Sequence, residues 1–62
     1  MPWYFIFENE DGEPFAVQDT NYTSAFLTLC KNFPNDTFEL VNDFSADDFG
    51  DDRIDAMGLD VF

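Results

Sequence analysis

The sequence predicts an α+β fold: a three-stranded sheet in strand order 2-1-3, built on an antiparallel hairpin (ββαβ), with one packed helix and a short acidic C-terminal helix. Two alternating apolar segments flank a turn sequence, and a helical pattern and a third alternating segment follow them. Hydrophobic residues make up 45% of the 62 residues, far more than a disordered acidic tail carries. We therefore expect one folded domain, residues 1–62, with a single core.

The first two strands are expected to form a hairpin. Aromatic and β-branched residues alternate from Trp3 to Glu8, which is typical of a strand. Residues 9–12, Asn-Glu-Asp-Gly, are a turn sequence, because Asp-Gly tolerates the positive φ angles of hairpin turns. Phe15 and Val17 then resume the alternation, so the two strands should pair antiparallel.

A helix and a third strand are expected next. Asp19 or Thr20 is the predicted N-cap, and Pro34 cannot continue the helix. The apolar residues of the helix recur at helical spacing and are Tyr22, Phe26, Leu29, Cys30 and Phe33. Alternation from Thr37 to Val41 predicts the third strand. A right-handed crossover places it beside the first strand, with the helix on the sheet face of Phe5, Phe7, Phe15, Val17 and Phe38.

The opposite sheet face would be apolar and would need a cover; its residues are Tyr4, Ile6, Ala16 and Val41. The last segment of the chain and a second copy of the protein are both candidates for that cover. The third strand would also be a sheet edge, and Pro14 removes part of the other edge from pairing. We expect a homodimer, formed through the open face or through the edge at 37–41.

The last segment predicts a short acidic helix from about Ala46 to Met57. Ser45 would cap it with Asp48 three residues on, and Gly58 would end it. Phe44 and Phe49 are either anchors for a partner or core residues, and we interpret them as core. At helical spacing, one arc of this helix would be almost purely carboxylate, formed by Asp47, Asp48, Asp51, Asp52 and Asp55.

Charge is the main indication of function. The chain has fourteen acidic residues against two basic ones and a net charge of -12. Such self-repulsion favours a basic partner or a salty solvent as its explanation. The acidic helix would carry a net charge about every 3.4 Å, close to the phosphate interval of one DNA strand. A second acidic cluster on the hairpin would mimic the phosphates of the other DNA strand, and its residues are Glu8, Glu10, Asp11 and Glu13.

In element pattern over residues 3–41 and in charge over the rest, the chain resembles the small acidic proteins with which bacteriophages inhibit host enzymes. This class includes DNA-mimic anti-restriction and anti-CRISPR proteins and inhibitors of uracil-DNA glycosylase and RNA polymerase. The resemblance implies a basic nucleic-acid-binding host protein as the partner, bound in the host cytoplasm by competition for its basic site.

Other chemistries find little support in the sequence. It has no histidine, one cysteine and scattered glycines, so we expect no enzyme activity, no cofactor and no metal site. The shortage of basic residues argues against direct nucleic-acid binding, and no apolar run predicts a membrane span. Two alternatives stay open: an interaction module that uses the apolar sheet face, and a surface adapted to molar salt.

Overall fold

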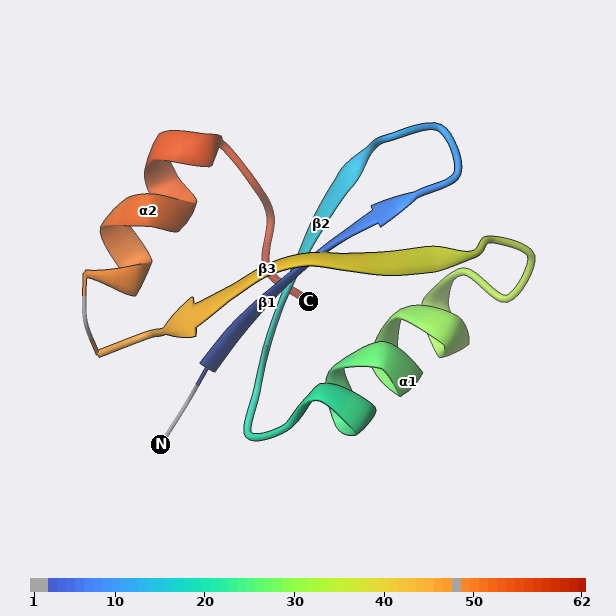
Figure 1. The fold of residues 1–62 in the computed structure, drawn as a ribbon, viewed down its shortest axis with the longest axis horizontal. Coiled ribbons are helices and arrows are strands. Elements are labelled where there is room, and N and C mark those ends of the chain that lie inside the picture. Colours follow the sequence, from blue (N-terminus) through green and yellow to red (C-terminus); the bar gives the residue numbers. More distant parts are fainter. Residues whose placement is uncertain (1–2, 48) are drawn as a thin grey trace.

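The computed structural model describes residues 3–47 and 49–62, which form three strands and two helices (Figure 1). In chain order these are β1 (Trp3–Asn9), β2 (Pro14–Asp19), α1 (Tyr22–Asn32), β3 (Phe38–Ser45) and α2 (Gly50–Met57). The strands form one sheet in the order β2-β1-β3, with both neighbours antiparallel to β1. The predicted α+β class and strand order are therefore confirmed.

The hairpin between β1 and β2 is held by an asparagine side chain. Asn9 Oδ1 accepts hydrogen bonds from the backbone N–H groups of Asp11 at 3.0 Å and Glu13 at 2.8 Å. Gly12 adopts a φ of 80°, a region that favours glycine. The turn lies where the sequence predicted it, and it sets the register in which Phe7 faces Phe15.

The N-cap of α1 is Asn21, so the prediction of Asp19 or Thr20 was wrong. Asn21 Oδ1 accepts a hydrogen bond from Ser24 N–H at 2.8 Å, the usual geometry of a capping side chain. Asp19 is the last residue of β2, and its carboxylate accepts the N–H of Thr20 at 2.6 Å instead. The strand therefore runs two residues beyond the last apolar position of its sequence pattern.

The face of the sheet under α1 holds the first of two core clusters. Its buried members come from both strands of the hairpin and from α1: Phe5, Phe7, Val17, Ala25 and Leu29. Phe38 and Leu40 of β3 pack against it from the side, together with three phenylalanines, Phe15, Phe26 and Phe33. Tyr22, predicted on the buried face of the helix, is 44% exposed at its first turn.

β3 contains a bulge at Val41, which changes the face that the strand presents. Leu40 lies opposite Phe7, whereas Asn42 lies opposite Ile6, so Val41 is an extra residue in the ladder. Val41 is 48% exposed and does not belong to the apolar face on which we had placed it.

The bulge explains why β3 was predicted too short, as 37–41 instead of Phe38–Ser45. Because one residue is inserted, Phe38 lies on the α1 face while Phe44 turns to the opposite face. The intervening Asn42 and Asp43 are polar and exposed, and in sequence they look like a loop.

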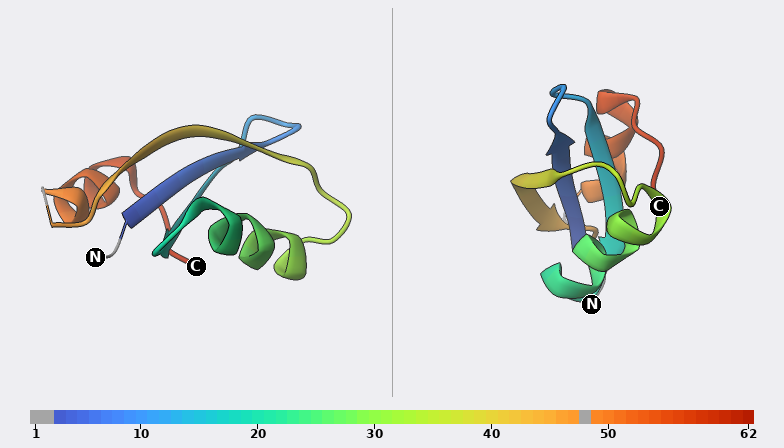
Figure 2. Two further views of the ribbon diagram at one scale, coloured as in Figure 1. Left: turned by 60° about the horizontal axis from the view of Figure 1, so that its bottom comes forward. Right: turned by 90° about the vertical axis from the view of Figure 1, so that its right-hand side faces the viewer.

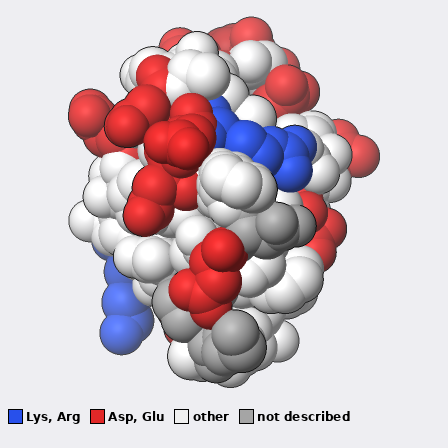
Figure 3. Space-filling model, turned by 90° about the vertical axis from the view of Figure 1, so that its left-hand side faces the viewer, with Lys and Arg blue, Asp and Glu red and all other residues white. Residues whose placement is uncertain are grey.

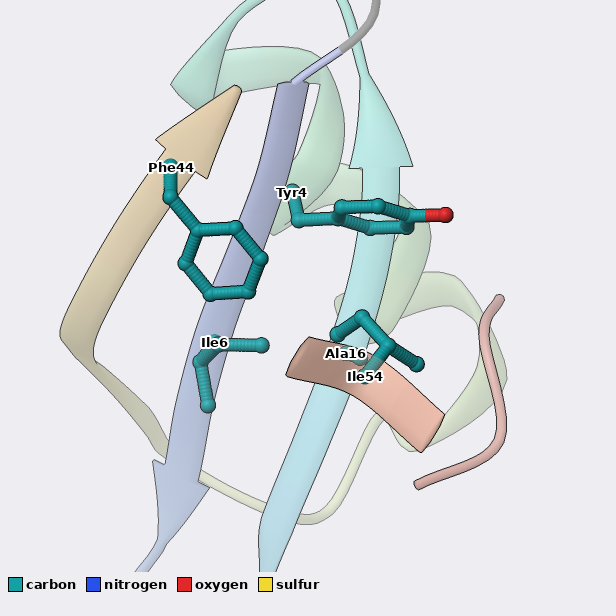
Figure 4. Packing of buried hydrophobic residues seen from close by; sticks show 5 residues of the cluster. All are labelled: Tyr4, Ile6, Ala16, Phe44 and Ile54. Atoms are coloured by element: carbon teal, nitrogen blue, oxygen red, sulfur yellow. The ribbon is translucent and has the colours of Figure 1, made fainter. Parts of the chain in front are cut away.

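The second face of the sheet is covered by α2 (Figure 4). Five buried residues form this cluster, Tyr4, Ile6, Ala16, Phe44 and Ile54, and Ala46 and Leu59 pack beside it. Of the two candidates for the cover, the last segment of the chain supplies it. The alternative function, an interaction module that binds through this apolar face, therefore loses its surface.

α2 begins at Gly50, not at Ala46. Ser45 ends β3, and its Oγ accepts the N–H of Asp47 at 3.2 Å in a local turn. Asp48, the other half of the predicted capping box, lies outside the described residues. The C-cap prediction is confirmed: Gly58 has a φ of 68°, and its N–H donates to the carbonyls at the end of α2.

The end of the chain lies along the outer edge of β2. Val61 forms a parallel bridge with Ala16, and the N–H of Phe62 donates to the carbonyl of Ala16 at 2.9 Å. The ring of Phe62 packs against Phe15 and Phe33, with centroids 5.9 and 5.6 Å away. Within the described residues, the outer edge of β3 is the one left without a neighbouring segment.

Candidate partner-binding surface

The acidic residues predicted to bind a partner lie in two groups. The α2 acidic surface consists of Asp47, Asp51, Asp52 and Asp55, and the hairpin acidic surface consists of Glu8, Glu10, Asp11 and Glu13. All eight residues are exposed. The ninth predicted residue, Asp48, lies outside the described residues.

The two acidic surfaces lie at opposite ends of the sheet. β1 begins beside the end of β3, where Trp3 faces Ser45, and runs to the hairpin, where Glu8 faces Pro14. Figure 1 shows α2 at the left of the molecule and the hairpin turn at the upper right, in a molecule whose longest extent is 32 Å. Figure 2 (left) also shows the two well apart. The structure does not bring the hairpin beside α2 as a mimic of the second DNA strand.

The single carboxylate arc predicted from Asp47 to Asp55 does not form. Asp51, Asp52 and Asp55 belong to α2, whereas Asp47 lies in the turn that precedes it. Residues 51–55 make up about 7.5 Å of helix, whereas the nine residues 47–55 of the predicted longer helix would have made up about 13 Å. Charge is still concentrated here: Figure 3, which faces this end, shows acidic side chains gathered around a basic one.

Two of these carboxylates also stabilise the fold. Asp51 and Asp52 lie in the first turn of α2, where negative charge interacts favourably with the helix dipole. Asp51 also accepts a hydrogen bond from the hydroxyl of the buried Tyr4. This bond, burial and the charges of Asp51 and Asp55 raise the pKa of Tyr4, so its phenol stays protonated and continues to donate.

Arg53 places a positive charge within the α2 acidic surface. Its guanidinium carbon lies 4.0 Å from the centroid of the Phe44 ring, a cation–π contact with a core residue. The guanidinium therefore lies against Phe44, one of the buried residues of the apolar cluster beneath α2.

Phe49 was predicted to be a core residue, and this prediction was wrong. Phe44 is core as interpreted, at 7% exposure, but Phe49 is 76% exposed and precedes α2 with a left-handed backbone. In the sequence, Phe44 and Phe49 both stand among aspartates, so the pattern gives no signal that separates them. Phe49 adds an apolar side chain to the α2 acidic surface.

Other kinds of site are not seen in the described part of the chain. Residues 3–47 and 49–62 form no pocket and no group of three or more metal-binding side chains. Neither of the two described helices is long and apolar enough to cross a membrane. The exposed acidic surfaces and the exposed Phe49 are the features on which a function can be argued.

Comparisons with models of protein families, with curated proteins and with solved structures found no match to this chain.

Proposed function

We propose that this protein is a small acidic binding protein that inhibits a nucleic-acid-binding host enzyme by occupying its basic surface in place of DNA. The enzyme classes that fit are a defence nuclease, a glycosylase or a polymerase in the host cytoplasm. The observation that carries the proposal is the net charge of -12, with exposed carboxylates gathered at the two ends of a small folded domain.

The chemistry of the partner follows from this charge. A surface this acidic attracts Lys- and Arg-rich grooves over distances near the Debye length, about 8 Å at physiological ionic strength. The same charge repels nucleic acid, so the protein competes with DNA and does not bind it. Complementary charge speeds encounter and excludes wrong partners more than it adds affinity.

The α2 acidic surface is the proposed contact. It combines carboxylates with an exposed aromatic ring, the composition of an interface with an apolar centre and a charged rim. The hairpin acidic surface faces away from it and serves as a charge-matched comparison within the same molecule.

The test is displacement of labelled duplex DNA from purified enzymes, for example a uracil-DNA glycosylase, a Cas9 nuclease, a restriction endonuclease and a bacterial RNA polymerase. A variant with Asp47→Asn, Asp52→Asn and Asp55→Asn removes three charges and retains Asp51, which holds Tyr4. Exposed ion pairs contribute about 0.2–1 kcal/mol each to binding, so the loss of three such pairs should raise Kd roughly 3- to 150-fold.

The control variant carries Glu8→Gln, Glu10→Gln and Glu13→Gln and has the same net charge. We expect it to displace DNA nearly as well as the parent, and we expect the α2 variant to approach the control as salt is added. A parent chain that displaces DNA from none of these enzymes would sink the proposal.

A further inference from the structure

Phe49 is the most exposed of the large hydrophobic residues in the described chain, with 76% of its surface open to water. Ile54, five residues on in α2, is buried on the sheet at 4% exposure. α2 therefore has a core-facing residue of its own, and Phe49 contributes little to packing.

The backbone of Phe49 is also unfavourable for its residue type. Its φ of 59° and ψ of 22° lie in the left-handed region, and it is the non-glycine residue with positive φ among those described. A bulky side chain there is an outlier, whereas glycine or asparagine adopts this conformation easily. Retaining phenylalanine at such a position favours a use for the ring itself.

The backbone that carries this ring is closely packed at the next residue, Gly50. A Cβ on Gly50 would lie 2.5 Å from the carbonyl oxygen of Ser45 and 3.1 Å from Cδ2 of Tyr4, so the chain passes very close to the sheet there. Gly50 is buried, and the N–H of Arg53 donates to the carbonyl of Phe49 at 3.1 Å. On its C-terminal side, the backbone of Phe49 is therefore held by the first turn of α2 and by the close approach of Gly50 to Ser45 and Tyr4.

The surroundings of this ring are negatively charged. Asp47 precedes it by two residues, and Asp51 and Asp52 follow it, all exposed. Two copies of this surface would repel each other, and so would an anionic membrane. A basic protein is the partner whose charge is complementary.

We propose that Phe49 is the apolar anchor of the α2 acidic surface and inserts into an apolar pocket rimmed by Lys and Arg side chains on the partner. Rigid aromatic residues at the centre of an interface often supply most of its binding energy, because little side-chain entropy is lost on binding. The inference rests on the proposed function for the charge of the partner, and it adds the contact that sets affinity and residence time.

The test uses whichever enzyme of the DNA-displacement panel the parent chain binds. Kd is measured at several ionic strengths for Phe49→Gly, for Phe49→Ala and for the control Leu27→Ala. Leu27 is 54% exposed on α1, away from α2 (Figure 1). Phe49→Gly removes the ring and also relieves the backbone, so circular dichroism should report a fold at least as stable as the parent's.

We expect both Phe49 variants to raise Kd by about 30-fold or more, equivalent to about 2 kcal/mol, without changing the slope of log Kd against log salt. The Leu27 control should stay within about twofold of the parent. The acidic triple variant should change the slope instead, which separates the apolar contact from the electrostatic one.

Three results would overturn the inference, each in a different way. An unchanged Kd for Phe49→Gly, with weakened binding by the acidic variant, would remove the anchor and leave the proposed function standing. A parent chain that displaces no DNA would remove both. A parent dimer that Phe49→Gly converts to a monomer in light scattering would show that the ring binds a second copy.

Discussion

The hydroxyl of Tyr4 donates a hydrogen bond to the carboxylate of Asp51, which joins the second residue of β1 to the first turn of α2. It joins two residues 47 positions apart in sequence and ties the helix to the sheet face that it covers. The acidic surface and the stability of the fold are therefore linked through Asp51.

The first prediction concerns Tyr4→Phe. The variant keeps the packed ring and loses the hydrogen bond, so we expect the free energy of unfolding at neutral pH to fall by about 1 kcal/mol. Because the folded pKa of Tyr4 is raised, this contribution is present below the unfolded value near 10 and is lost as pH rises through the folded pKa. Urea unfolding from neutral to alkaline pH measures both effects.

Tyr22→Phe is the control for that experiment. Tyr22 is 44% exposed, so its substitution should leave the free energy of unfolding within about 0.5 kcal/mol of the parent's. The prediction fails if Tyr4→Phe and Tyr22→Phe lose stability equally, or if the gap between Tyr4→Phe and the parent does not narrow at alkaline pH.

The second prediction concerns Gly50→Ala. The added Cβ would meet the carbonyl oxygen of Ser45 at 2.5 Å, and that backbone atom cannot move aside as a side-chain end can. We expect a loss of about 1–3 kcal/mol in denaturant unfolding, typical of overpacking. Gly12→Ala is the contrasting variant, since its Cβ meets nothing within 4 Å and only the φ of 80° opposes it. A smaller loss at Gly50 than at Gly12 would contradict the close contact.

The elements that could be predicted from sequence are those whose signals are local. The hairpin follows from alternation and the Asp-Gly turn, and the strand order follows from the handedness of the crossover. α2 starts at Gly50, where the backbone passes very close to the carbonyl of Ser45. A close approach of this kind leaves no trace in the periodicity of the sequence, so the start of α2 could not be predicted from it. Ala46, Asp47 and Phe49 were predicted to be helical and instead lie in the turn before α2.

The candidate site was predictable to a similar degree. Exposure of the hairpin carboxylates follows from their charge and the turn sequence around Gly12. The separation of the two acidic surfaces depends on which end of β1 each one adjoins. The exposure of Phe49 could be seen only in the three-dimensional structure, because Phe44 and Phe49 look alike in sequence. The bulge at Val41 turns Phe44 into the core, whereas Phe49 stays exposed.

The third prediction distinguishes a binding surface from adaptation to salt. Within α2, the like-charged pairs Asp51/Asp55 and Asp52/Asp55 cost about 0.2–0.5 kcal/mol each at low ionic strength. These repulsion energies are small compared with a free energy of unfolding of about 5 kcal/mol, so we expect the protein to be folded in low-salt buffer and to show a cooperative thermal transition there. Added KCl at about 1 M should raise the midpoint by several degrees through screening. A chain unfolded without salt would favour the environmental explanation.

The last prediction concerns assembly. The homodimer expected from the sequence had two surfaces available, and α2 covers one of them by burying Tyr4 and Ile6. The remaining surface is the outer edge of β3, where the bulge at Val41 interrupts the ladder and Glu39 and Asp43 are exposed. Bulges and charges on an edge oppose strand pairing between copies, and each copy carries -12. We therefore expect light scattering at micromolar concentration to give a monomer mass, for the parent and for Val41→Lys alike. A parent dimer that Val41→Lys dissociates would contradict this and would identify β3 as the dimer edge.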